Sequence, residues 1–247
     1  MSNPKIHLEF QQALLEIYER YRPSSHSFFL HLANCRTADL LACGLLDEFY
    51  KRYQSAMHAT RVMAYFLPHL DVLELRMRKL HILADDDGNS QGDSHQFQLR
   101  RTWTFMLGRS PLMADHELGE LDQLKMHLDP TTAEFVAQVQ ELYPRSLGAW
   151  VLVEGLAHDW IGALLRALKV HFLGVERTDY FTENYSSGVE VRHAAESLEI
   201  VSLVLSRKPE LFDRTLSSAM KMAEALNSLW SGLDGLLTKI PSDVPTQ

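Results

Sequence analysis

Cysteine, proline and glycine are all scarce in this sequence of 247 residues. Its two cysteines, Cys35 and Cys43, are too few for the disulfide framework of a secreted protein, so we expect a reducing, cytoplasmic environment. The nine prolines and twelve glycines occur without a Ser/Gly-rich linker or an internal repeat. We therefore predict one domain over residues 1–247, in which 238–247 form a frayed tail.

Long apolar runs and clustered positive charge are missing as well. No stretch approaches the ~18 uncharged apolar residues of a membrane span, and the opening MSNPKIHLEF lacks the apolar core of a signal peptide. The net charge of −8 argues against nucleic acid, because phosphate binding needs a basic face. We expect neither a membrane nor a nucleic acid as partner, which leaves small molecules.

Alternating strand patterns are also absent, whereas apolar residues recur at helical spacing nearly everywhere, so we predict an all-α fold. Thr37 is a predicted N-cap, and Thr131 with Glu134 fits a capping box after Pro130. The predicted helices cover residues 5–21, 26–34, 37–66, 70–86, 94–108, 115–127, 131–143, 146–173, 178–185, 188–206 and 209–237.

A carboxylate interrupts the apolar stripe of the central predicted helix, SLGAWVLVEGLAHDWIGALLRAL. Glu154 shares this face with Leu147, Val151 and Ile161 at steps of three and four residues. Burying an ionised glutamate without compensation is too costly, so Glu154 is protonated, ion-paired or bound to a metal. His158, one turn further on, is either a second ligand or a satisfied core histidine.

The Asp-rich stretch LADDDGNSQGDSH is not a calcium loop. Its three acids are contiguous rather than alternating, and the twelfth position counted from Asp85 is Gln96, which offers no carboxylate. Asp85 ends one predicted helix and His95 begins the next, with its imidazole on the inward stripe, so a short loop brings both to one end of the helix pair. We expect Asp86 and Asp87 to be solvated residues of the turn.

A third set of ligand-type residues lies in GVEVRHAAES, where Glu190 and His193 are three residues apart and face the same way. Ferritin-like dimetal carboxylate proteins use this Glu-x-x-His spacing, although it also arises by chance in many helices. Mixed carboxylate and imidazole donors suit iron or manganese better than a structural zinc. Three such sets in one helical domain favour a metal site.

These stretches together resemble the haem-oxygenase-like diiron oxidases, a group that includes the chlamydial CADD-like proteins and shares its fold with PqqC and the TenA thiaminases. The resemblance implies a haem-oxygenase-like helical bundle, in a fold class where homodimers are common. It runs along most of the chain, through HSFFLHLANCRTADLLACGLLDEFYKRYQ, RMRKLHILADDDGNSQGDSH, LGAWVLVEG and YFTENYSSGVEVRHA.

Carried over residue by residue, the resemblance implies two Fe(II) ions as cofactor, with O2 as co-substrate. Glu154 would also be the catalytic residue. The family's first histidine of the last ligand helix falls on Ser186 or Asn184, neither of which is a good iron ligand, and His158 is the candidate to replace it. The predicted metal ligands are Asp85, His95, Glu154, His158, Glu190 and His193.

The leading hypothesis is an O2-activating non-haem iron oxidase or oxygenase that acts on a small amino-acid-like or carboxylate substrate in specialised metabolism. Arg192 and Arg100 are the predicted residues for binding the substrate's carboxylate. One alternative is a metal-free enzyme of the PqqC or TenA type acting on a heterocycle. The other is a non-enzymatic helical binding protein without a metal site, in which a basic neighbour neutralises Glu154.

Overall fold

The structure is a computed structural model that describes residues 4–66, 70–88, 93–112 and 128–238, and within these ranges it is helical without a strand. The predicted all-α fold is thereby confirmed for this part of the chain. The α-helices are α1 (Pro4–Arg20), α2 (Ser27–Asn34), α3 (Thr37–Ala42), α4 (Leu45–Ala64), α5 (Leu73–Asp86), α6 (His95–Leu107), α8 (Pro130–Leu142), α9 (Gly148–Lys169), α10 (Asp179–Phe181), α11 (Val189–Arg207) and α12 (Phe212–Leu237).

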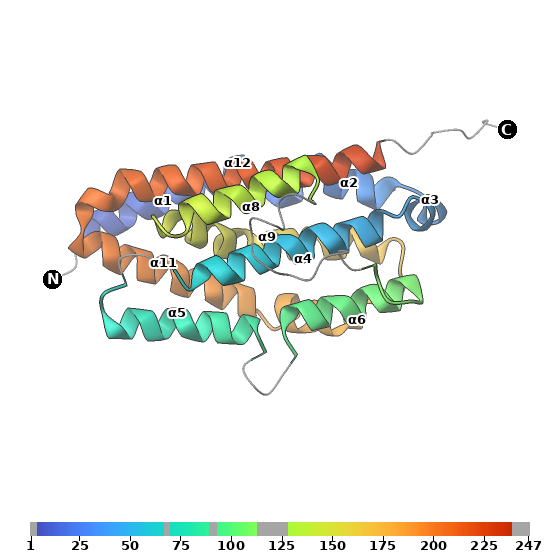
Figure 1. Ribbon diagram of the computed structural model, residues 1–247, viewed down its shortest axis with the longest axis horizontal. Helices are drawn as coiled ribbons and strands as arrows, with labels where there is room; N and C mark the ends of the chain where they lie inside the picture. Colours follow the sequence, from blue (N-terminus) through green and yellow to red (C-terminus); the bar gives the residue numbers. More distant parts are fainter. Residues whose placement is uncertain (1–3, 67–69, 89–92, 113–127, 239–247) are drawn as a thin grey trace.

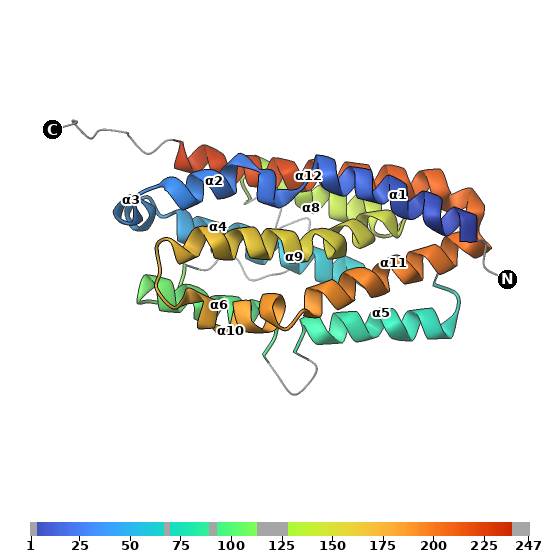
Figure 2. The same cartoon turned by 180° about the vertical axis from the view of Figure 1, so that it is seen from behind.

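Most of the helices run along the long axis of an elongated bundle (Figure 1). Helices α1, α8 and α12 form one edge, α4 and α9 cross the middle, and α5 and α6 lie end to end along the opposite edge (Figures 1 and 2). Helix α9 is the central element, because it packs against α2, α11 and α12. None of the described helices is both long and apolar enough to cross a bilayer.

Small residues let α9 approach its neighbours closely. A Cβ on Gly148 would lie 1.8 Å from the backbone oxygen of Thr215 in α12. A Cβ on Gly155 would lie equally close, 1.8 Å, to the hydroxyl of Tyr18, which donates to the carbonyl of Val151 at 3.0 Å. The tight packing of α1 and α12 fixes the rotation of α9 about its axis, and thereby the direction of Glu154.

The predicted helix over 37–66 is interrupted. Gly44 adopts a left-handed conformation with φ +72°, which glycine tolerates and other residues resist, and the chain therefore divides into α3 and α4. The predicted cap at Thr37 is wrong, since this residue lies inside α3 and its hydroxyl is 3.0 Å from Nδ1 of His171. Likewise, the predicted helix 178–185 divides into α10 and a π-helical turn over Thr182–Ser186.

The capping box at Thr131 is also wrong, because Asp129 caps α8 instead. Its carboxylate accepts from the backbone N–H groups of Thr131 at 3.1 Å and Thr132 at 3.3 Å. The predicted helix over 115–127 and nearly all of the predicted tail lie outside the described residues. The remaining helices begin and end within four residues of their predicted limits.

We expect Gly148→Ala to destabilise the protein by about 2 kcal/mol or more, because the new methyl group meets backbone rather than a movable side chain. Gly235→Ala is the matched control, since a Cβ at this helical position meets nothing within 4 Å. This variant should gain up to about 1 kcal/mol from helix propensity. Urea unfolding of both variants measures the difference, and equal stabilities would contradict the close approach of α9 and α12.

Candidate metal centre

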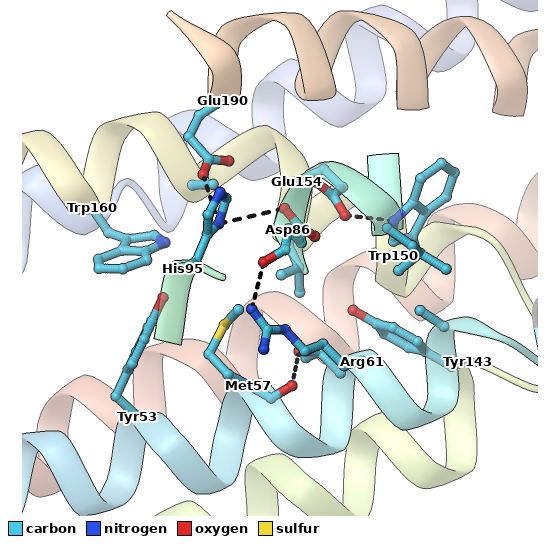
Figure 3. Close-up of a pocket in the computed structure, with 15 residues that line it drawn as sticks. Tyr53, Met57, Arg61, Asp86, His95, Tyr143, Trp150, Glu154, Trp160 and Glu190 are labelled. Atoms are coloured by element: carbon cyan, nitrogen blue, oxygen red, sulfur yellow. Dashed lines mark hydrogen bonds and ion pairs between the residues drawn. The ribbon is translucent and has the colours of Figure 1, made fainter. Parts of the chain in front are cut away.

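Four helix segments meet where α5 ends and α6 begins. The last turn of α5 and the first turn of α6 face the middle of α9 and the first turn of α11 (Figures 2 and 3). Gly88, with φ +92°, follows α5 and turns the chain away from the helix axis, and Ser94 precedes α6 as its N-cap. The junction therefore presents side chains from four elements to one enclosed space.

Three potential metal ligands converge there. One donor atom each from Glu154, Glu190 and His193 can be chosen so that all three lie within 4.8 Å of one another. Glu190 and His193 are buried, with 5% and 2% of their surface exposed. The two residues come together because they lie three apart at the start of α11, as the sequence predicts.

His95 and Asp86 complete the cluster. Nδ1 of His95 lies 3.5 Å from Oδ1 of Asp86 and 3.8 Å from Oε1 of Glu190, and Nδ1 of His193 lies 3.6 Å from the same Asp86 oxygen. The Asp86 carboxylate thus lies between two imidazoles. The expectation that Asp86 is a solvated turn residue is wrong, because it belongs to the last turn of α5 and only 15% of its side chain is exposed.

Arg61 holds the carboxyl end of α5 in place. Its Nη2 donates to the backbone carbonyl of Asp86 at 2.9 Å. Its Nη1 lies 3.3 Å from the carboxylate of Asp87. Figure 3 shows Arg61 below the end of α5. The side chain of Asp87 is 46% exposed, in agreement with the prediction for this residue. Adjacent acids of one turn therefore have opposite environments.

Asp85 lies behind His193 rather than inside the cluster. Its Oδ2 is 3.4 Å from Nε2 of His193, and its Oδ1 is 3.5 Å from Nδ1 of His81. Nδ1 of His193 is buried and has no hydrogen-bond partner among the described residues. Metal-bound histidines commonly give their other N–H to a carboxylate in this way. The structure thus places Asp85, a predicted metal ligand, beside His193 in a position to orient its ring, and outside the group of three convergent donors.

The electrostatics of the cluster favour a bound cation. Burial, followed by the charge of Glu154, raises the pKa of Asp86 well above its usual range, and burial with Asp86 raises the pKa of Glu190 in the same direction. Burial and, secondarily, Arg61 lower the pKa of His95 to about 3, so its imidazole is neutral at pH 7. A neutral imidazole beside crowded carboxylates is the protonation state that a metal requires.

The cluster borders a small cavity of about 70 Å³. Tyr53, Tyr143, Trp150 and Trp160 supply aromatic walls (Figure 3). The indole Nε1 of Trp150 donates to Oε1 of Glu154 at 2.6 Å. The hydrogen bond fixes one oxygen of this carboxylate, and the aromatic rings limit the access of water to the other.

His158 is not brought into the cluster. Its ring stacks on Tyr185 of the π-helical turn, with centroids 4.5 Å apart and planes 14° from parallel. Asn184, one of the two positions for the missing histidine, is fully buried, and its amide Nδ2 donates to Oε1 of Gln98 and to the carbonyl of Tyr180, each at 2.9 Å. Ser186, the other position, is exposed.

Neither predicted carboxylate-binding arginine lines the cavity. Arg192 is exposed and Arg100 is half-buried. The cations near the cluster are Arg61 and Lys79, which the sequence analysis missed. Nζ of Lys79 is buried 3.8 Å from the centre of the Trp150 ring, and burial lowers its pKa below the usual range while Glu154 and Asp86 oppose this effect.

A signal for two of the missed residues is present in the sequence. Leu75, Lys79, Ile82 and Asp86 follow one another at steps of four, three and four residues, so two charges interrupt the inward stripe of α5. The same pattern identified Glu154 on α9. Applied to α5, it selects Asp86 over Asp85 as the inward acid.

The fold and the site define a helical bundle with a buried carboxylate–histidine centre. The chain belongs to the iron-containing redox enzyme family, whose model matches residues 48–227, and this confirms the haem-oxygenase-like fold predicted from the sequence. A CADD-like protein of unknown function from Nostoc punctiforme PCC 73102 has a similar structure, with a TM-score of 0.65 over 92% of this chain and 98% of that chain. At 14% identity, the likeness shows the fold alone. No curated protein matches the chain.

We expect Asp86→Asn to weaken divalent metal binding by about ten- to a hundredfold, because it removes a charge between His95 and His193. Asp87→Asn is the control, since its carboxylate faces Arg61 and solvent, and its affinity should stay within about threefold of wild type. Calorimetric titration with Zn²⁺ or Mn²⁺ measures both. Equal losses in the two variants would place the metal elsewhere.

Removal of one crowded charge should have opposite effects with and without metal. When the pKa of a carboxyl group is higher in the folded than in the unfolded state, the free energy of unfolding falls as the pH rises from the unfolded pKa through the folded one. Glu190 therefore destabilises the metal-free protein at neutral pH. We expect Glu190→Gln to raise the melting temperature in EDTA by about 2–4 °C per kcal/mol of relief. The gain should shrink as the pH falls toward the unfolded pKa.

With metal present, the same substitution should remove most of the metal-induced rise in melting temperature, because a neutral amide is a poor ligand. Thermal melts of wild type and Glu190→Gln, each with EDTA and with Mn²⁺, separate the two effects. A variant that is less stable than wild type in EDTA, with unchanged metal dependence, would show that Glu190 is only a structural core acid.

Proposed function

We propose that this protein is a non-haem iron-dependent oxidoreductase that uses O2, and two Fe(II) ions, to oxidise a small amino-acid-like or carboxylate substrate. Membership of the iron-containing redox enzyme family supports the general class. The observation that carries the proposal is the convergence of Glu154, Glu190 and His193, with donor atoms within 4.8 Å of one another.

The residues present fit iron. Carboxylate oxygens and imidazole nitrogens are the donors that ferrous iron accepts, and cysteine takes no part in the cluster. The buried Nδ1 of His193 makes no hydrogen bond among the described residues and lies 3.6 Å from Oδ1 of Asp86, as expected for two atoms that could share a metal ion. His95, Glu154, Glu190 and His193 would hold the metal together with Asp86. When bound, ferrous iron supplies the electrons that reduce O2.

The surrounding side chains have distinct tasks in this proposal. Trp150 orients Glu154 through its indole N–H, and Asp85 orients His193 from the opposite side of the ring. The aromatic walls exclude water from the space where the substrate reacts. With a neutral amide at Asn184, one of the two positions at which the resemblance puts a histidine, the two proposed iron ions would have unequal donor sets.

The metal-free alternative of the TenA type, which would need an activated cysteine nucleophile, has little support. Neither cysteine lines the cavity, and burial raises the pKa of Cys35, which opposes formation of a nucleophilic thiolate. The metal-free binding protein is the second candidate, because the buried Nζ of Lys79 lies 3.8 Å from the centre of the Trp150 ring and interacts electrostatically with Glu154. Lys79 and Arg61 together can offset part of the negative charge without a metal.

Iron stoichiometry distinguishes these functions. Anaerobic loading with ferrous iron, removal of loosely bound metal and analysis should give about two irons per chain in wild type. Glu154→Ala should lose this iron, whereas Glu141→Ala, which removes an exposed acid paired with Arg145, should retain it. Oxidation of the bound iron by O2 should then be detectable by its absorbance. Absence of tightly bound iron in wild type would overturn the oxidase and leave the binding protein.

A further inference from the structure

A second hollow adjoins the metal-site cavity from outside. It lies between the end of α4 and the outer side of α5 and has a volume of about 280 Å³. Ala64 and Leu83 line both this groove and the inner cavity, so the two spaces share a wall. Helix α5 also packs against α11.

The mouth of the groove presents apolar side chains beside one exposed arginine, Arg76, whose Nε donates to the backbone carbonyl of Leu70. Tyr65 and Leu80 line it with 62% and 45% of their surface exposed. Leu73 and Met77, exposed to 73% and 58%, precede Leu80 at helical steps of seven and three residues and extend the apolar surface along α5. Such a surface beside an opening is typical of a site that receives an apolar molecule.

Lys79 connects the groove to the cavity. Its side chain lines the groove, and its Nζ lies 3.8 Å from the centre of the Trp150 ring, whose indole belongs to the inner cavity. Only 3% of this residue is exposed, and Nζ has no hydrogen-bond partner among the described residues. A buried ammonium group with three unused donors is costly unless an anion binds to it.

The carboxylates of the cluster offset only part of the positive charge of Lys79. Glu154 and Asp86 attract Lys79 electrostatically, yet neither forms an ion pair with it within 4.0 Å. When a metal takes up their charge, the ammonium group loses this compensation. An anion bound at the inner end of the groove would restore it and keep Lys79 charged.

We propose that the groove between α4 and α5 is the entrance for the substrate and that Lys79 binds the substrate's anionic group. The substrate class is a molecule with a single anionic group, such as a carboxylate, and an apolar body. This inference rests on the proposed function for the role of the bound molecule as substrate. It replaces the exposed Arg192 and the half-buried Arg100 as the anion-binding residue.

The probes are octanoate and octanol, which has the same chain length but no charge. The protein is loaded with Zn²⁺, which does not change its oxidation state. Calorimetric titration should show octanoate binding to wild type about ten- to a hundredfold more tightly than octanol, the range expected for a charge-assisted contact. Lys79→Met should remove this preference without changing the affinity for octanol, and Lys79→Arg should retain most of it. Arg78→Met, which breaks an external pair with Glu199, should behave as wild type.

The groove itself is tested with two exposed residues of α5. Leu80→Asn should weaken binding of both probes by about tenfold, because Leu80 lines the groove. Met77→Asn, three residues away on the same face but outside the groove, should have no such effect. Equal affinities in these two variants, or an unchanged octanoate preference in Lys79→Met, would overturn the proposal.

Zinc content is measured on every sample, so that failure of the proposed role of Lys79 can be told apart from failure of the proposed metal centre. Wild type that binds zinc without preferring octanoate overturns the role of Lys79 and leaves the metal centre intact. Wild type that takes up no metal overturns the proposed function. In that case the preference for octanoate in the metal-free protein, and its loss in Lys79→Met, still decides whether Lys79 binds anions.

Discussion

Mutual repulsion of buried carboxylates is the constraint on which the rest of this structure depends. Asp86, Glu154 and Glu190 come from three different helices and face one space, where burial and their shared charge raise the pKa values of Asp86 and Glu190. A fold gains nothing in stability from such an arrangement. The bundle tolerates it because the packing of α9 against α1, α11 and α12 is strong enough to hold the acids together, and this is the expected design of a site that a cation completes.

Residues around the cluster offset part of its negative charge and orient its side chains. Arg61 ties down the end of α5 through the Asp86 carbonyl, and Lys79 adds a second positive charge behind Trp150. Nε2 of His193 lies 3.4 Å from Asp85, and its Nδ1 faces Asp86 within the cluster. Residues beside the cluster thus orient its side chains and offset part of its charge.

The family and the fold fix the general class of this protein but not its reaction. The fold places a carboxylate–histidine cluster between α5, α6, α9 and α11, and the reaction depends on the residues around it rather than on the fold. In this chain Asn184 is bound to Gln98, His158 stacks on Tyr185, and the cations near the cluster lie on α4 and α5. These residues and the groove beside Lys79 carry the proposals made above for metal and substrate binding.

The sequence by itself determined the all-α fold, the limits of most helices and the inward direction of Glu154, His95, Glu190 and His193, because these follow from a local helical period. The helical stripe of Leu75, Lys79, Ile82 and Asp86 also indicates that Lys79 and Asp86 face inward, although a shift of one residue in this stripe would rotate each side chain by about 100°. Only the tertiary structure decided that Asp86 lies between His95 and His193, that His158 stacks on Tyr185, and that Nζ of Lys79 lies over the Trp150 ring. These choices depend on contacts between helices far apart in the chain, which no local pattern encodes.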